Sequence, residues 1–167
     1  MVKFMYYYNI FFLFSILGHF IENFFYPSKD SGILFGYWTP IYGVGVVIIL
    51  IIYKLISKFA KKEYLKVPLL FLCSSIILSI SELFAGILIE RLLKVTFWDY
   101  SKEKFSIFRY TSLKMALIWG LSSIVLIYLI MPVIDKSINY IPKSITYILI
   151  TLFCCDFIVS ITPYLIN

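Results

Sequence analysis

The sequence has 167 residues, of which 62% are hydrophobic and only 14% charged, and its mean hydropathy is +0.95. A soluble globular domain is about half apolar and a quarter charged, so this composition excludes an ordinary water-soluble fold. The net charge of +6 does not indicate nucleic acid, because the basic residues lie mostly between apolar blocks, where anionic lipid headgroups are the expected partner.

Five blocks of the sequence are long enough to cross a membrane, because a spanning helix needs about 20 mostly apolar residues. They cover approximately residues 4–26, 35–57, 67–93, 113–134 and 144–166. Pro27-Ser28-Lys29-Asp30 stops the first block, and Pro68 is expected in the first turn of the third helix. The sequence therefore predicts an all-α fold, a polytopic transmembrane helix bundle of about five helices in a single domain, residues 1–167.

The charges in the loops between the blocks indicate how the chain is oriented in the membrane. Lys and Arg favour the cytoplasmic side of a membrane, but the basic residues on the two sides of this chain nearly balance. The dense group of lysines from Lys54 to Lys66 favours placing that loop, and with it the N-terminus, in the cytoplasm. We expect a multi-pass protein of the cell membrane.

Two pairs of short motifs predict an internal repeat. Gly18-His19-Phe20-Ile21-Glu22 and Gly86-Ile87-Leu88-Ile89-Glu90 both read Gly-x-x-Ile-Glu, and Ile41-Tyr42-Gly43 is matched by Ile118-Trp119-Gly120. A two-helix unit repeated in the same direction would place Glu22 and Glu90 at matched depth. The alternative is coincidence in a sequence dominated by a few apolar residue types.

Polar and small residues form stripes along the expected helices. Spacings of three and four residues place them on one helical face, and the stripes are Ser15, Gly18, His19 and Glu22 in the first helix, and Ser75, Ser79, Glu82, Gly86 and Glu90 in the third. The second helix offers Gly36, Pro40 and Gly43, where small residues permit close packing and proline frees a backbone carbonyl.

We expect these stripes to converge on one polar pocket, because ionisable groups in spanning helices usually face the bundle interior or a wet cavity. Glu22 and Glu82 would be its acidic centre and Glu90 would lie at its mouth, with His19 and Tyr42 beside them. The structural alternative for His19 is a neutral hydrogen-bonded partner of Glu22.

The segment after the third helix would cover the mouth of this pocket. Arg91 and Arg109 are candidate counter-ions, and Asp99 with Arg109 would close the mouth. The structural alternatives are a solvated pair of Glu90 and Arg91, and a purely structural lid in which Asp99 accepts a hydrogen bond from Ser101 in a turn.

No metal site and no cofactor are expected. The single histidine cannot form a paired-histidine centre, and Cys73, Cys154 and Cys155 have no metal-ligand spacing. A glycine-rich phosphate loop is missing, so any use of ATP would come from another subunit. Asp156 lies in the last helix, but no nearby residue forms a pattern with it.

Several motifs carry a resemblance to a known family. They are Phe14-Ser15-x-x-Gly18-x-x-x-Glu22, Pro40-Ile41-Tyr42-Gly43-x-Gly45, Glu82-x-x-x-Gly86-x-x-x-Glu90, Trp98-Asp99-Tyr100-Ser101 and Trp119-Gly120. In this order the chain resembles the bacterial family labelled putative ABC-transporter type IV, or CmpB-type, from about Phe11 to Asp135, which leaves the last helix outside. Gly36-Tyr37 departs from the Gly-Pro that is usual in that family.

Three functions are consistent with these features. The first, which the resemblance favours, is a small permease-like or substrate-binding subunit of a transporter that holds a small polar or cationic solute and works with the lipid bilayer, a second copy or an ATPase subunit. The second is a membrane-embedded enzyme or assembly factor that acts on lipid or cell-envelope substrates. The third is a non-catalytic scaffold. Enzymatic activity belongs only to the second function and is the less favoured expectation.

Overall fold

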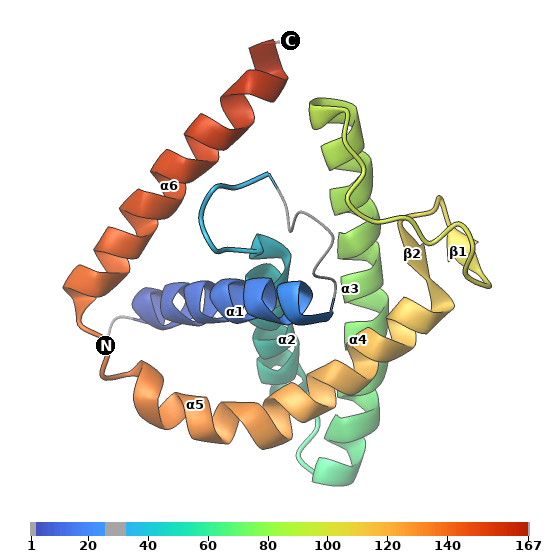
Figure 1. Cartoon of the computed structure of the whole chain (residues 1–167). Coiled ribbons are helices and arrows are strands. Elements are labelled where there is room, and N and C mark those ends of the chain that lie inside the picture. The colour runs from blue at the N-terminus through green and yellow to red at the C-terminus, as the bar shows by residue number, and fades with distance from the viewer. Residues whose placement is uncertain (1–2, 26–32, 167) are drawn as a thin grey trace. The chain divides into compact units, whose positions relative to one another are not determined.

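A computed structural model gives the fold of residues 3–25 and 33–166 (Figure 1). The elements in chain order are α1 (Lys3–Phe25), α2 (Pro40–Phe59), α3 (Glu63–Leu93), β1 (Ser106–Ile107), β2 (Thr111–Ser112), α4 (Leu113–Val125), the π-helical segment η1 (Leu126–Ile130), α5 (Met131–Ile138) and α6 (Lys143–Ile166). In the described part, five helical stretches are long and apolar enough to cross a membrane, with α4, η1 and α5 joined into the fourth. The predicted all-α transmembrane bundle is confirmed.

Helix boundaries differ from the prediction where a proline or a loop contact decides them. α2 begins at Pro40 rather than Phe35, because residues 35–38 form a loop in which the amides of Phe35 and Gly36 donate hydrogen bonds to Asp156. α3 begins four residues early, at Glu63, so Pro68 lies inside the helix rather than in its first turn. The predicted break at residues 27–30 lies outside the described residues.

The fourth spanning stretch contains a π-helical turn. Pro132 has no backbone N–H and cannot donate to the carbonyl four residues earlier. Just before it, the Met131 amide bonds to the carbonyl of Leu126, five residues back, which is the π-helical pattern. The proline therefore accounts for the local widening between α4 and α5.

Contacts divide the chain into two compact units: unit 1 holds Met1–Val47 and Val133–Asn167, and unit 2 holds Ile48–Pro132. In unit 1, α1 packs against α6, where the Thr146 hydroxyl donates to the buried Asn9 side chain at 2.7 Å. Phe153 of α6 adds edge-to-face contacts with Phe11 and Phe12. The single domain over residues 1–167 stays a prediction.

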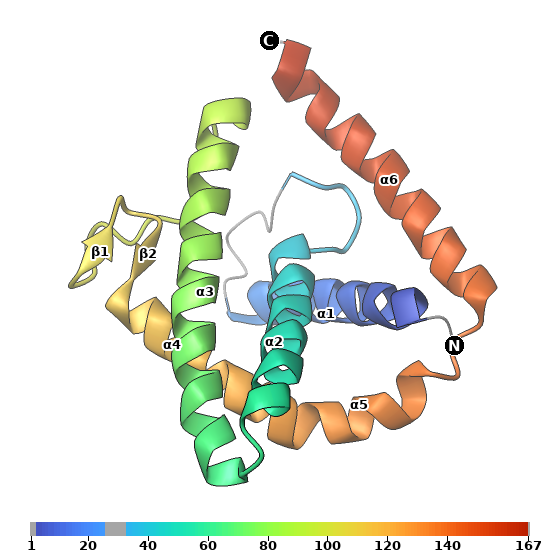
Figure 2. The same cartoon turned by 180° about the vertical axis from the view of Figure 1, so that it is seen from behind.

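In unit 2, α3 packs along α4, and the hairpin formed by β1 and β2 lies beside α3 in both views (Figures 1 and 2). Leu70 and Leu78 of α3 are buried in this unit. The antiparallel register pairs Ser106 with Ser112 and Ile107 with Thr111. Ser112 also caps α4, because its hydroxyl accepts a hydrogen bond from the Met115 amide. The hairpin therefore leads directly into the fourth spanning stretch.

Two glycines permit close helix contacts, one in each unit. A methyl group added at Gly43 would overlap the Ser15 hydroxyl and the Phe11 carbonyl of α1. A methyl group added at Gly120 would overlap the Ser75 hydroxyl and the Phe71 ring of α3. The first contact fits the expected role of Gly43 as a small residue that permits close packing, and Gly120 has the same kind of contact in unit 2.

Replacing Gly43 by alanine is expected to destabilise unit 1 by about 1–3 kcal/mol, because a backbone carbonyl cannot move aside as a side chain can. Thermal unfolding in detergent micelles would measure the effect. Val44→Ala, at an exposed position of the same helix, is the control and should change the midpoint little. Equal midpoints for Gly43→Ala and the wild type would show that the contact is looser than described.

Candidate functional site

Glu82 is the most deeply buried carboxylate among the described residues. It lies on α3 with only 4% of its surface exposed. The Tyr100 hydroxyl donates to its Oε1 at 3.1 Å, and the Trp119 indole N–H lies 3.4 Å from its Oε2. Three predicted residues therefore meet in unit 2, contributed by α3, the loop that follows it and α4.

Glu90 lies two helical turns further along the same face of α3, about 12 Å from Glu82 along the helix axis. It accepts hydrogen bonds from the Arg109 guanidinium and the Tyr110 hydroxyl. The Tyr110 ring covers Gly86, midway between the two glutamates, where any larger side chain would overlap the ring. Arg109 therefore forms an ion pair with Glu90. The role of Arg109 as a counter-ion of the predicted pocket stays a prediction.

The segment from Lys94 to Ser112, called the hairpin segment below, folds back onto α3. Lys94 ends the helix with φ of 58°, in the left-handed region. The Trp98 indole N–H donates to the Tyr110 carbonyl at 2.9 Å, and the Tyr100 amide donates to the Arg109 carbonyl at 2.7 Å. These hydrogen bonds join the two arms of the segment. Hydrogen bonds to Glu82 and Glu90 hold the arms against α3.

Asp99 occupies a turn of the hairpin segment. Its Oδ1 accepts from the Ser101 amide at 2.8 Å, which confirms the predicted turn contact. Hydrogen bonding to Ser101, with a smaller contribution from the Arg109 charge, lowers the pKa of Asp99 below its usual value. The stabilisation from this contact is present above the ordinary aspartate pKa and is lost as pH falls through the lowered one. Closure of a pocket mouth by Asp99 and Arg109 stays a prediction.

Hydroxyl groups continue the polar face of α3 away from Glu82. Ser75 is buried and Ser79 is half-buried, and neither hydroxyl has a hydrogen-bond partner among the described residues. Unpartnered buried hydroxyls are uncommon in native proteins and mark places where a water or a ligand group can bind. The polar face of unit 2 thus combines the carboxylates of Glu82 and Glu90 with hydroxyl groups that have no partner among the described residues.

Unit 1 holds the other predicted pocket residues. His19 is 9% exposed, its Nε2 lies 2.8 Å from the Asn23 amide nitrogen, and its ring lies against that of Tyr37. Glu22 is half-buried on the same helix, and the Tyr42 ring packs where Gly18 has no side chain. Because Glu22 and Glu82 belong to different units, their convergence on one pocket stays a prediction.

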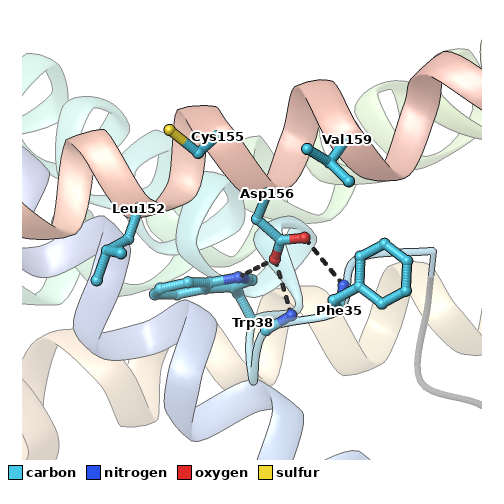
Figure 3. A pocket seen from close by; sticks show the side chains of 7 residues that line it. Phe35, Trp38, Leu152, Cys155, Asp156 and Val159 are labelled. Atoms are coloured by element: carbon cyan, nitrogen blue, oxygen red, sulfur yellow. Dashed lines mark hydrogen bonds between the residues drawn. The ribbon is translucent and has the colours of Figure 1, made fainter.

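Asp156 of α6 has hydrogen-bond partners that no sequence pattern predicts. It accepts from the amides of Phe35 and Gly36 at 3.0 and 2.8 Å, and from the Trp38 indole at 2.7 Å (Figure 3). Ser160, one turn further along α6, donates a fourth hydrogen bond at 2.7 Å. The Asp-x-x-x-Ser spacing could have predicted the contact with Ser160, because both residues lie on one helical face. The contacts with backbone amides leave no pattern in the sequence.

A shallow depression of about 480 Å³ lies beside this carboxylate (Figure 3). Its lining is mostly apolar and consists of Phe35, Gly36, Trp38, Leu152, Cys155, Asp156 and Val159. Because donors from the protein already surround both oxygens of Asp156, the carboxylate serves first to hold the loop before α2 against α6. Among residues 3–25 and 33–166, no cluster of three His, Cys, Asp or Glu side chains is arranged to hold a metal ion.

Comparison with known proteins places this architecture in a family. The model of the family described as putative ABC-transporter type IV matches residues 9–162. The chain belongs to this family. No curated protein and no solved structure matches the chain.

The putative ABC-transporter type IV match corrects one expectation. The motifs extend only to about Asp135, but the family match continues through most of α6. The last helix is therefore part of the family architecture, which agrees with the contacts of Asp156 to the loop before α2. Together with the five apolar helices, membership identifies a transport-related membrane protein.

Asp156→Asn is expected to destabilise unit 1 by about 1.5–3 kcal/mol, because an amide nitrogen would face N–H donors and the charge-assisted hydrogen bonds would be lost. Hydrogen exchange at the amides of Phe35 and Gly36 should accelerate in the variant. Ser160→Ala removes one of four donors and serves as the milder control. Unchanged exchange in Asp156→Asn would contradict the anchoring role.

Tyr110→Phe is expected to loosen the hairpin segment without unfolding α3, because it removes one hydrogen bond to Glu90 and keeps the ring over Gly86. Hydrogen exchange of residues 98–112 should rise while exchange in α3 stays nearly constant. Tyr140→Phe, at an exposed tyrosine of unit 1, is the matched control. Protection of the hairpin that survives in Tyr110→Phe would show that other contacts fasten it.

Proposed function

We propose that this protein is a small permease-like subunit of a membrane transporter and that Glu82 binds a small polar or cationic solute. The observation that carries the proposal is the burial of the Glu82 carboxylate on a membrane-spanning helix. Holding a carboxylate at such a place is costly, and residues that bear this cost in membrane proteins commonly mark a solute or ion pathway.

The surroundings of Glu82 support a cationic or hydrogen-bonding solute. In the described part of the chain, no lysine or arginine is paired with Glu82, so a positive group from outside would complement it. The hydroxyl group of Ser79, about one helical turn before Glu82, adds an acceptor on the same face of α3. An ammonium or guanidinium group would find a charge and a neutral oxygen there.

The proposal also covers the energy source for transport and the orientation of the chain in the membrane. An ATPase subunit or a second copy of this chain would complete the transporter, and the family description supports the ATPase. We infer from the family resemblance that the protein lies in the cell membrane of a bacterium. The lysines from Lys54 to Lys66 favour an N-terminus in the cytoplasm.

One observation favours a scaffold as the second candidate. The groups bonded to Glu82 and Glu90 all come from the hairpin segment and α4, so both carboxylates already have a structural task. In that case the glutamates would fix the fold of unit 2 and no solute would be needed. The two functions predict different effects of removing the Glu82 charge. Removal would weaken solute binding in a permease-like subunit, whereas a scaffold binds no solute.

Equilibrium dialysis of the full chain in lipid nanodiscs, with radiolabelled choline and methylammonium as probes, would distinguish them. Binding does not require the energising subunit. We expect the wild type to bind at least one of these cations and Glu82→Gln to weaken binding by tenfold or more, because the variant keeps the shape and loses the charge. Glu103→Gln, a carboxylate of the same hairpin segment, is the matched control and should retain binding.

Helix content and elution volume would verify that all three proteins are folded. Equal affinity in Glu82→Gln and the wild type would contradict the role of Glu82. Binding of neither cation by the wild type, combined with a lowered unfolding midpoint in Glu82→Gln, would favour the scaffold.

A further inference from the structure

The hairpin segment must lie at a membrane surface, because it connects two spanning stretches. α3 ends at Leu93 immediately before it, and α4 begins at Leu113 immediately after it. α3 has 31 residues, and at 1.5 Å per residue its length of about 46 Å exceeds a hydrocarbon core of about 30 Å. Its last turns, which carry Glu90, therefore extend to the level of the lipid headgroups.

The tip of the hairpin holds large apolar side chains away from the rest of unit 2. Phe105 and Phe108 are each 76% exposed, and Ile107 between them is 52% exposed. Two of these residues have a left-handed backbone, with φ of 58° at Phe105 and 48° at Phe108. Bulky residues adopt this conformation rarely and at a cost in free energy. Within unit 2 the exposed rings gain too little packing to offset that cost.

The base of the hairpin is held firmly, unlike its apolar tip. Trp98, Tyr100, Arg109 and Tyr110 form the cross-links and the bonds to α3 described above. A surface that is fixed before it binds loses less conformational entropy on binding. The exposed rings are thus presented in one orientation and need not be ordered by a partner.

Positive charge flanks the apolar tip. Lys102 and Lys104 are both exposed on the arm that precedes it, and neither is paired with a carboxylate in the described part of the chain. Glu103 between them is paired with Lys114 at 2.8 Å. From residue 94 to residue 114 the sequence has five basic and two acidic residues. The Lys102 charge also helps to lower the pKa of the nearby Asp99 carboxyl. The hairpin therefore combines apolar rings with exposed, net positive charge.

We propose that this hairpin is a binding surface for anionic phospholipid headgroups. Phe105 and Phe108 lie in the boundary between headgroups and acyl chains, and Lys102 and Lys104 contact the lipid phosphates. The charge complementarity and the direct continuity with α3 and α4 select a lipid rather than a protein as the occupant. The proposal concerns unit 2 alone and is independent of solute binding at Glu82.

Quenching of an added indole tests the position of the tip. Phe108→Trp would be reconstituted in phosphatidylcholine vesicles with 30 mol% phosphatidylglycerol, and its fluorescence compared with that of the wild type. We expect strong quenching of the added signal by lipids brominated at the 6,7-positions and weak quenching by aqueous iodide. Phe105→Trp provides the same measurement if Phe108→Trp does not fold.

A second measurement tests the charge. Brominated phosphatidylglycerol should quench the added indole more than brominated phosphatidylcholine at the same mole fraction. The double change Lys102→Gln and Lys104→Gln should remove this preference, which we expect to correspond to a roughly five- to thirtyfold weaker lipid affinity. The double change Lys102→Arg and Lys104→Arg keeps both charges and should retain it.

Three outcomes would overturn the proposal. Dominant quenching by iodide would place the tip in water. Quenching by neither agent would show that protein covers the tip, whether unit 1, a second copy or another subunit. Quenching by brominated lipid without a preference for phosphatidylglycerol, or with a preference that survives in the glutamine variant, would show that Lys102 and Lys104 do not bind the headgroup.

Discussion

A carboxylate on a membrane-spanning helix must find hydrogen-bond donors in the protein, because the hydrocarbon core offers none. In unit 1, Asp156 of α6 takes its donors from the loop before α2, so that loop is held against the helix. In unit 2, Glu82 of α3 takes its donors from Tyr100 of the hairpin segment and from Trp119 of α4. The same physical requirement therefore fixes two connecting segments, the loop before α2 and the hairpin segment.

Glycine contacts bear on the predicted internal repeat. Gly43 packs on Phe11 and Ser15, and Gly120 packs in the same way on Phe71 and Ser75, each a Phe-x-x-x-Ser pair on the preceding partner helix. Seven residues after the serine, the first helix has Glu22 and the third has Glu82. These contacts favour pairing Glu22 with Glu82, whereas the tyrosine rings over Gly18 and Gly86 agree with the Gly-x-x-Ile-Glu motifs, which pair Glu22 with Glu90. The repeat itself stays a prediction, now with two registers that are each supported by one pair of contacts.

The number and approximate positions of the helices could be predicted from the sequence, because a bilayer requires each spanning segment to be about 20 residues long and mostly apolar. Blocks of about 20 apolar residues can satisfy their backbone only as helices, so element type followed from composition, with errors at Pro40 and Pro68. The hairpin was beyond prediction, because Phe105, Phe108 and Arg109 adopt positive φ without glycine. The role of Asp156 was missed because two of its partners are backbone amides about 120 positions away, which have no residue-type signature.

The bonds that fasten the hairpin also shield the carboxylate at the centre of the proposed site. Tyr100 uses its hydroxyl on Glu82 and its amide on Arg109, and Arg109 in turn binds Glu90. A solute that reaches Glu82 as proposed would have to replace the Tyr100 hydroxyl, and its binding would weaken the attachment of the hairpin. Solute binding and movement of the hairpin would then be coupled through a single hydrogen bond, so lipid that holds the hairpin tip at the surface would oppose opening.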